Sequence, residues 1–416
     1  MLWTAALPFL SLMPRIREGW QQRILRYCPT GPFDIWLQAA SGGEAFIAAK
    51  IVEELDTMVP AGRQLTVLST TGTRQGYDVL SRAMQTFNAN RSINPAVSYF
   101  PFDAPFLMQK AFSRFNPTVA VIIETELWPG FLLTAKKYGV PVLLVNGRMS
   151  EKSFHSYRHL KTFFKRYGPL KILAISEKDR QRFAKLTGAD RTDVMNNIKY
   201  DQISLPPEET PYNIPLCLPE SVPFIVLGSV RREEELQIVR TIKLIRAIKP
   251  DAVIGLFPKH LERVTPWLQL LTENEIPAVL RNTPVRDIVP GDVVVWNRFG
   301  ELHDAYRRAD AAFVGGSLVN LGGQNFLEPL ISGLKPVIGP HWQNFSWVDH
   351  RLFSQGLVRQ VTNEEELADL LLTDLPSRSD REKTVQAAMA LLAEHKGGTR
   401  QACQMILNGL KERRKN

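Results

Sequence analysis

The feature that most constrains this 416-residue chain is a repeated alternation of short apolar runs with helix-like stretches. Such an alternation is typical of a parallel β-sheet covered by helices. Strands are predicted in two series, over residues 34–40, 64–70, 118–124, 141–147 and 171–176, and then over 223–229, 252–258, 293–297, 311–316 and 335–340. Helices are predicted over residues 45–55, 131–139, 233–248 and much of 363–411. The sequence therefore predicts an α/β protein with two doubly wound, Rossmann-like domains.

A proline-dense segment separates the two series. Residues 202–222 hold five prolines and a sixth follows at Pro223, a density that neither helix interiors nor central strands tolerate. We expect an extended linker there. The predicted organisation is an N-terminal segment, a first domain, the linker, a second domain and a C-terminal helix with a basic tail, over residues 1–30, 31–201, 202–222, 223–395 and 396–416. In such folds ligands bind at the carboxyl ends of the strands, so we expect a cleft between the two domains.

Composition narrows the class of partner. Lysine and arginine outnumber acidic residues by 51 to 42, a formal charge of +9 that suits phosphates, acidic sugars or acidic lipid headgroups. The positive charge is dispersed along the chain, which disfavours nucleic acid as a partner. Cys28, Cys217 and Cys403 lie far apart without a CxxC spacing, so neither a disulfide framework nor a zinc site is predicted.

The N-terminus permits two interpretations. Residues 1–14 carry no charge but are shorter than the ~20 apolar residues that a membrane-spanning helix needs. This stretch contains Trp3 and is followed by Arg15, Arg17, Trp20, Arg23 and Arg26. Residues 1–26 are therefore either an interfacial anchor beside anionic lipids or a plain packing helix.

Four acidic or basic residues of the first domain are site candidates: Glu44, Glu124 and Glu126 follow predicted strands, and Lys199 lies just before the linker. Glu44 lies in SGGE, residues 41–44, either as a helix-capping partner of Ser41 or as a general base. Glu124 and Glu126 leave the strand 118–124, where they form a carboxylate site if the strand continues, or cap the next helix together with Thr125. Lys199 is either a solvated lysine or a cation for a leaving phosphate.

The second domain has glycine-rich turns suited to a phosphate. Lys259 and His260 follow one strand, and Gly300 and Glu301 open a helix. In residues 315–341, four glycines precede a helix predicted over 325–333, whose first N–H groups would hold a phosphate without metal. Glu328 is placed to accept hydrogen bonds from ribose hydroxyls. The alternative is a flexible loop with a structural glutamate.

The chain has no G-x-G-x-x-G opening its first βαβ unit and no G-x-x-x-x-G-K-[ST] motif, which argues against dinucleotide and P-loop chemistry. It also lacks H-E-x-x-H and G-x-S-x-G, which argues against zinc proteases and esterases.

Taken in order, the motifs resemble those of the bacterial 3-deoxy-D-manno-octulosonic acid (Kdo) transferases, lipid A glycosyltransferases of the GT-B type. The resemblance covers nearly the whole chain and rests on SGGE (41–44), TTGTRQG (70–76), PFDAP (101–105), ETELWP (124–129), NGRMSEKS (146–153), NIKYD (197–201), GS (228–229), PKHLER (258–263), FVGGSL (313–318), GGQNFLEP (322–329) and GPHWQNF (339–345).

The resemblance implies inverting transfer of Kdo from CMP-Kdo to a lipid A precursor, at the cytoplasmic face of the bacterial inner membrane and without a metal or cofactor. It makes residues 31–201 the acceptor side and 223–395 the CMP-sugar-binding side. Glu44 resembles the family's proton acceptor, and Glu124 and Lys199 match positions assigned to transition-state stabilisation. The residues that match the CMP-binding segments are Pro258, Lys259, Phe299, Gly300, Glu301, Asn325, Phe326, Leu327 and Glu328.

The chain departs from the family pattern at several of these motifs. Gln38 and Gln324 stand where the family usually has histidine, Lys259 stands for arginine and Gly42 for valine, and residues 230–235 read VRREEE in place of Thr-His-Glu-Gly-Glu-Glu. Lysine cannot make the bidentate phosphate contact of arginine. Two alternatives therefore stay open: a divergent paralogue that uses another CMP-activated acidic sugar or another acceptor, and a non-catalytic nucleotide- or lipid-binding relative.

Overall fold

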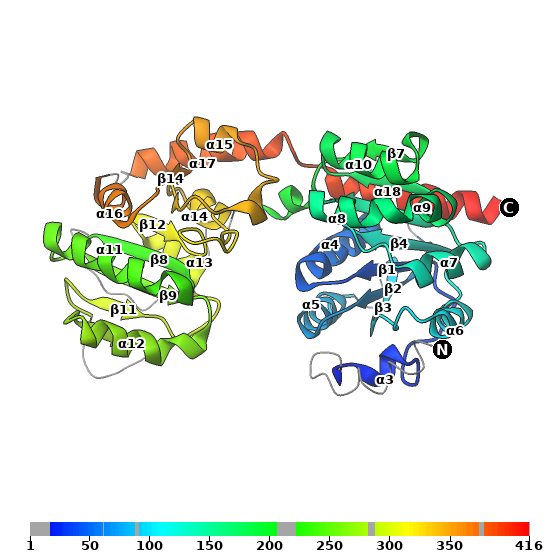
Figure 1. The fold of residues 1–416 in the computed structure, drawn as a ribbon, viewed down its shortest axis with the longest axis horizontal. Coiled ribbons are helices and arrows are strands. Elements are labelled where there is room, and N and C mark those ends of the chain that lie inside the picture. The colour runs from blue at the N-terminus through cyan, green and yellow to red at the C-terminus, as the bar shows by residue number, and fades with distance from the viewer. Residues whose placement is uncertain are drawn as a thin grey trace. The chain divides into compact units, whose positions relative to one another are not determined.

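Each predicted sheet forms the centre of its own compact unit (Figure 1). The structure is a computed structural model that describes residues 17–60, 62–87, 91–205, 222–281, 288–373 and 378–415. Unit 1 comprises Met1–Gln202 and His395–Asn416, and unit 2 comprises Ile203–Glu394. The C-terminal helix is thus part of unit 1, which the sequence pattern did not indicate. The predicted fold class of two doubly wound, Rossmann-like parallel sheets is confirmed.

The sheet of unit 1 has seven parallel strands in the order β3-β2-β1-β4-β5-β6-β7. The strands are β1 (Ile35–Ala39), β2 (Leu65–Thr71), β3 (Ile93–Tyr99), β4 (Val119–Ile123), β5 (Val142–Gly147), β6 (Lys171–Ala174) and β7 (Thr192–Val194). Strand β3 was not predicted because Asn94 and Pro95 interrupt its apolar pattern. It lies at the edge of the sheet, where a proline does not remove a ladder hydrogen bond from a central position.

Alternating side chains of the strands bury both faces of this sheet. Ile35 and Leu37 of β1 pack in one core, whereas Trp36 packs in the other. The first core is covered by α4 (Gly42–Met58), α5 (Arg74–Met84) and the C-terminal α18 (Gly398–Lys415). The second is covered by α6 (Pro105–Phe115), α7 (Pro129–Lys137), α9 (Lys161–Tyr167) and α10 (Glu177–Thr187).

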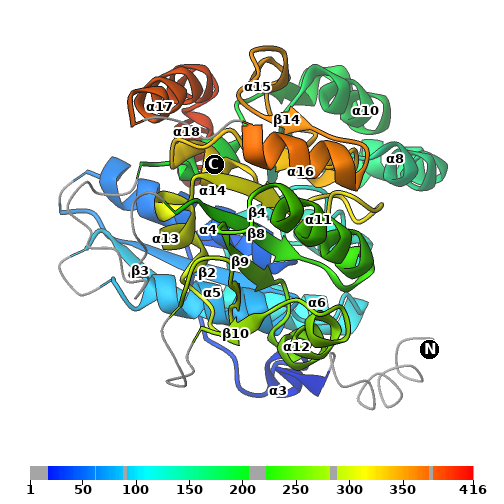
Figure 2. The same ribbon diagram turned by 90° about the vertical axis from the view of Figure 1, so that its left-hand side faces the viewer.

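The sheet of unit 2 also has seven parallel strands, in the order β10-β11-β9-β8-β12-β13-β14. The strands are β8 (Phe224–Val230), β9 (Val253–Pro258), β10 (Ala278–Leu280), β11 (Val293–Val295), β12 (Ala311–Val314), β13 (Val337–Ile338) and β14 (Arg359–Gln360). One face is covered by α11 (Glu235–Ile248), α12 (Val264–Glu273) and α16 (Glu364–Thr373), and α13 (Leu302–Arg308) and α14 (Leu327–Ile331) lie on the other (Figure 2). Strands β7, β10 and β14 were missed because they lie at sheet edges and are only partly buried, so they lack the continuous apolar run that the equally short β11 and β13 have.

Two predicted segments lie largely outside the described residues: residues 1–16 of the N-terminal segment and 206–221 of the linker. In the described part that follows residue 16, Arg23 is buried and its guanidinium donates to the Gly72 carbonyl at 2.6 Å. The ring of Trp20 packs on Phe102 at 5.2 Å. Within the described residues, we find no helix of sufficient length and apolarity to span a bilayer.

Candidate active site

Glu44 lies in the turn between β1 and α4. Ser41 is the N-cap of α4, and its hydroxyl accepts from the Glu44 N–H at 3.3 Å while donating to Glu44 Oε1 at 3.0 Å. The other carboxylate oxygen, Oε2, accepts from the Ala40 N–H at 2.6 Å. The capping arrangement considered from the sequence is therefore present. It holds the carboxylate in one orientation at the carboxyl end of the sheet, which a base also requires.

The surroundings of Glu44 make it a weak acid. Its side chain is buried, with 8% of the residue exposed, and this burial raises the pKa to about 7. The negative charges of Glu124 and Glu126 raise the pKa further, whereas the hydrogen bonds from Ala40 and Ser41 lower it. A carboxylate whose pKa lies near neutral pH is suited to accept a proton from a substrate hydroxyl.

Glu124 and Lys199 form an ion pair near this carboxylate. Strand β4 ends at Ile123, and Glu124 has a φ of 62°, so the chain turns there instead of continuing as a strand. Lys199, on the 3₁₀ turn η3 (Ile198–Gln202), places its Nζ 2.9 Å from Glu124 Oε1. The expectation that Glu124 and Glu126 share a strand face is wrong, because the extended conformation stops before them.

The helix that follows Glu124 is capped by a residue that the sequence did not single out. Asp103 accepts from the N–H groups of Gly130 and Phe131 at 2.8 and 2.6 Å. The N-cap position of α7 is Trp128, which makes no side-chain cap bond, so the alternative of capping by Thr125 or Glu126 is also wrong. Burial raises the pKa of Asp103 to about 6. The motif PFDAP gives no local signal for this contact, because Asp103 and Gly130 lie 27 residues apart along the chain.

In unit 2, a cavity of about 500 Å³ opens at the ends of β8 and β9. Its lining includes the predicted nucleotide-binding residues Pro258, Lys259, Phe299, Gly300 and Glu328. The structure adds Ser229, Trp296, Arg298 and His303 to the same wall. Burial lowers the pKa of Lys259, and the carboxylate of Glu328 opposes this effect. Two cations and an aromatic wall can hold a phosphate and a planar base.

The other predicted residues of this segment do not line the cavity. Glu301 is paired with Arg281 at 2.7 Å and accepts from Trp296 Nε1 at 2.8 Å, so it fixes one wall. Asn325 donates to Glu328 Oε1 at 2.8 Å. Phe326 and Leu327 are buried in the core of unit 2.

The glycine-rich loop after β12 differs from its predicted role. The N–H groups of Gly316, Ser317 and Leu318 all donate to the carboxylate of Glu234, at 2.6, 2.9 and 2.9 Å. The loop therefore binds an anion supplied by the chain itself. Helix α14 spans only Leu327–Ile331, so the expected helix over 325–333 is wrong in length. Its shortness leaves little helix dipole to attract a phosphate.

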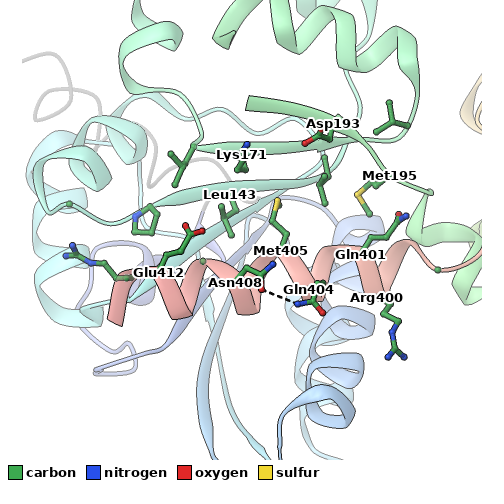
Figure 3. A pocket seen from close by; sticks show the side chains of 18 residues that line it. Leu143, Lys171, Asp193, Met195, Arg400, Gln401, Gln404, Met405, Asn408 and Glu412 are labelled. Atoms are coloured by element: carbon green, nitrogen blue, oxygen red, sulfur yellow. Dashed lines mark hydrogen bonds between the residues drawn. The ribbon is translucent and has the colours of Figure 1, made fainter. Parts of the chain in front are cut away.

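A further cavity, of about 860 Å³, lies in unit 1 between α18 and the strands β5–β7. Figure 3 shows Gln401 and Met405 of α18 pointing toward Leu143 of β5 and toward Met195, which follows β7. Predicted site residues do not line it. Across the described ranges, we find no cluster of three or more His, Cys, Asp or Glu residues able to hold a metal ion.

Comparisons with known proteins match unit 1 to a family model and most of the chain to curated relatives. Residues 18–202 match the family described as 3-Deoxy-D-manno-octulosonic-acid transferase (kdotransferase). The 3-deoxy-D-manno-octulosonic acid transferase of Haemophilus influenzae is 28% identical over 96% of this chain and 92% of its own length. The enzyme of the same name from Bordetella pertussis is 27% identical over 89% of this chain and 86% of its own.

Solved structures share the fold over most of the chain. A glycosyltransferase from Rickettsia africae covers 92% of this chain and all of its own at a TM-score of 0.60 and 14% identity. A putative UDP-N-acetylglucosamine 2-epimerase from Listeria monocytogenes covers 92% of this chain and 96% of its own at a TM-score of 0.55 and 14% identity. The architecture is that of GT-B glycosyltransferases, but an epimerase shares it, so the fold alone does not specify the reaction.

Proposed function

Because the chain belongs to the 3-deoxy-D-manno-octulosonic acid (Kdo) transferase family of glycosyltransferases, we propose that it transfers Kdo from CMP-Kdo to a hydroxyl of a lipid A precursor. One observation carries the proposal: Glu44, buried and with a pKa raised to about 7, lies beside Glu124 in the unit that matches the family. This is the environment that a general base for a sugar hydroxyl requires.

In the proposed reaction, Glu44 accepts the proton of the acceptor hydroxyl as the hydroxyl oxygen attacks the anomeric carbon of Kdo. The bond from that carbon to the CMP phosphate breaks on the opposite face, so the configuration inverts. The Lys199–Glu124 pair, at 2.9 Å, presents an ammonium held in one position to the charge that develops. Lys199 acts electrostatically because its Nζ is already paired.

The cavity of unit 2 is the proposed CMP site. Lys259 and Arg298 supply positive charge for the phosphate, and Glu328 supplies acceptors for ribose hydroxyls. Trp296 and Phe257 are stacked at 4.3 Å with an interplanar angle of 20°, which gives the cavity a flat aromatic wall for cytosine. Phe299 is 74% exposed and free to cover a bound base.

We propose that the enzyme works as a peripheral protein at the cytoplasmic face of the inner membrane. The surface segment α8 (Glu151–Tyr157) to α9 supports this, because five of its residues are Lys or Arg and only Glu151 is acidic. Leu160, between the two helices, is 47% exposed. The Tyr157 hydroxyl donates to the Thr125 carbonyl at 3.4 Å, next to Glu124 and Glu126. A basic segment with an apolar tip is suited to anionic lipid headgroups.

The test is transfer from CMP-Kdo to a lipid A precursor, followed by CMP release and product mass. We expect product from the wild-type protein and a rate lower by about 10²- to 10⁴-fold from Glu44→Ala, with CMP binding retained in the variant. Full activity of Glu44→Ala would exclude Glu44 as the base. The product mass also counts the sugars added.

The two alternatives give different results in the same assay. A divergent paralogue binds CMP but forms product only with another CMP-activated acidic sugar or another acceptor, which a donor panel in a thermal-shift assay would identify. A non-catalytic relative binds ligand without turnover of any donor. The substitution of Lys259 for the family's arginine supports testing the donor panel first.

A further inference from the structure

Helix α18 lies against two elements that carry candidate catalytic residues, α4 and η3. The chain leaves unit 1 after Gln202 and returns to it at His395. Helix α18 then packs on α4, which carries Glu44, and on η3, which carries Lys199. The Sγ of Cys403 donates to the Ile51 carbonyl of α4, and Ile198 of η3 packs in the same buried core.

Asp201, two residues after Lys199, binds the first turn of α18. Its Oδ1 accepts from the Gly397 N–H at 2.6 Å, and its Oδ2 accepts from the N–H of Thr399 at 2.6 Å and from the Thr399 hydroxyl at 2.5 Å. Hydrogen bonds to a carboxylate are stronger than neutral ones, and a negative charge is favoured at the N-terminus of a long helix.

The backbone geometry on the same side shows how close this contact is. A Cβ on Gly398 would lie 2.1 Å from the Asn196 carbonyl oxygen, so only glycine permits the approach. Asn196 also donates to Gln401 Oε1 at 2.8 Å and, from its side chain, to the Lys396 carbonyl at 2.7 Å. The segment before Lys199 is therefore bound to α18 as well.

From the other side, η3 is held by β5. The Ile198 N–H donates to Oδ1 of the buried Asn146 at 2.9 Å. Lys199 thus lies on a short turn that is fixed by the sheet on one side and by α18 on the other. Asp201 is the one acidic residue of η3, and its three bonds join the point where the chain leaves unit 1 to the point where it returns.

We propose that Asp201 is a positioning residue: by binding the N-terminus of α18, it holds Lys199 against Glu124 for glycosyl transfer. The inference rests on the proposed function of the same site. The bonds of Asp201 go to Gly397 and Thr399 at the start of α18, so Asp201 acts on Lys199 through the position of η3. Replacement of one carboxylate oxygen by an amide removes the charge and at least one of the three bonds to the first turn of α18, which lets Lys199 move from Glu124.

The experiment uses the full-length protein and combines Asp201→Asn with Lys199→Ala. We expect Asp201→Asn to lower kcat by about 10- to 100-fold, because a shift of about 1 Å at a catalytic group has an effect of that size. The KM for the donor should stay unchanged. In the Lys199→Ala background, Asp201→Asn should lower kcat no further, which a general loss of stability would not reproduce. Asp193→Asn, on the neighbouring strand β7, is the matched control and should retain full activity.

Equal losses from Asp201→Asn with and without Lys199 would overturn the proposal, as would full activity of the single variant. If Asp201→Asn does not fold, the pair Thr399→Val and Thr399→Ser replaces it, with activity expected only in the variant that keeps the hydroxyl. If the wild-type protein turns over no Kdo donor, the proposed function fails separately. Amide hydrogen exchange of residues 196–202 then decides the positioning role, with faster exchange expected in Asp201→Asn and unchanged exchange contradicting it.

Discussion

The two units each place a buried glutamate after the first strand of the sheet, and the two glutamates differ in how many N–H groups they bind. In unit 1, Glu44 follows β1, which pairs with β2 and β4, where the strand order reverses. In unit 2, Glu234 follows β8, which pairs with β9 and β12 at the corresponding point. Glu44 accepts from one backbone N–H, whereas Glu234 accepts from four, those of Arg231, Gly316, Ser317 and Leu318.

This difference separates a reactive carboxylate from a structural one. Four N–H groups occupy both oxygens of Glu234, so this carboxylate anchors the loop, whereas Glu44 accepts a single backbone N–H and keeps acceptor capacity for a substrate hydroxyl. Glu44 receives few, is buried and has Glu124 nearby, and its pKa rises to about 7. Glutamates at similar positions in two similar sheets therefore have different roles. The difference comes from the loop after β12, which supplies three N–H groups to Glu234.

The largest expected effect is the loss of the base in unit 1. Glu44→Ala should lower kcat by about 10²- to 10⁴-fold, the usual contribution of a general base, while CMP affinity stays the same. CMP release under saturating donor measures it. Glu53→Ala, an exposed glutamate on the same helix, is the control. If both variants lose activity equally, the contrast between the two glutamates has no catalytic meaning.

The structural role of Glu234 predicts the next effect. In Glu234→Gln, an amide replaces one oxygen that accepts N–H groups, so two donors lose their acceptor in a buried site. We expect the free energy of unfolding of unit 2 to fall by about 3 kcal/mol, because each buried unpaired donor costs about 1–3 kcal/mol. Urea unfolding measures this, with the exposed Glu233→Gln as control. An unchanged urea midpoint of Glu234→Gln would show that the Glu234 carboxylate does not stabilise the loop.

A smaller effect is expected at the phosphate cation of unit 2. Lys259→Ala should weaken CMP binding by about 10- to 100-fold, since hydrogen bonds to charged groups contribute about 1.5–3 kcal/mol. Calorimetry with CMP measures the affinity. Lys243→Ala, on α11 and exposed, should bind CMP as the wild type does. If both variants bind CMP with equal affinity, the CMP phosphate does not bind at Lys259 in this cavity.

The smallest expected effect is the pH dependence that distinguishes Glu44 from an ordinary glutamate. Only the ionised carboxylate accepts a proton, so with a pKa of about 7 the rate should fall as pH decreases below 7. Between pH 8 and pH 6 we expect kcat/KM to fall by about tenfold, with a plateau on the alkaline side. An inflection near pH 4.5 would show that burial does not raise the pKa of Glu44.

The positions of the central strands were predictable, because strands buried on both faces of a parallel sheet read as continuous apolar runs in the sequence. The central strands of both sheets were found in this way. The edge strands β3, β7, β10 and β14 were not found, because a proline or partial exposure interrupts their apolar pattern. The sequence pointed to four site residues because each follows a predicted strand or lies in a motif that resembles the family: Glu44, Glu124, Lys199 and Lys259. Asp103 and Glu234 were missed as anchors because their partners lie 27 and more residues away.

By itself, the sequence determined the two doubly wound sheets, their order and the residue types at the ends of their strands, because periodicity and turn chemistry are local properties. Tertiary structure alone decided which carboxylates are reactive and where the C-terminal helix packs. The pKa of Glu44 depends on burial and on the charges of Glu124 and Glu126, some 80 residues away along the chain. Likewise, the Asp201 contact joins segments about 200 residues apart. Such properties arise from long-range packing, which local patterns do not encode.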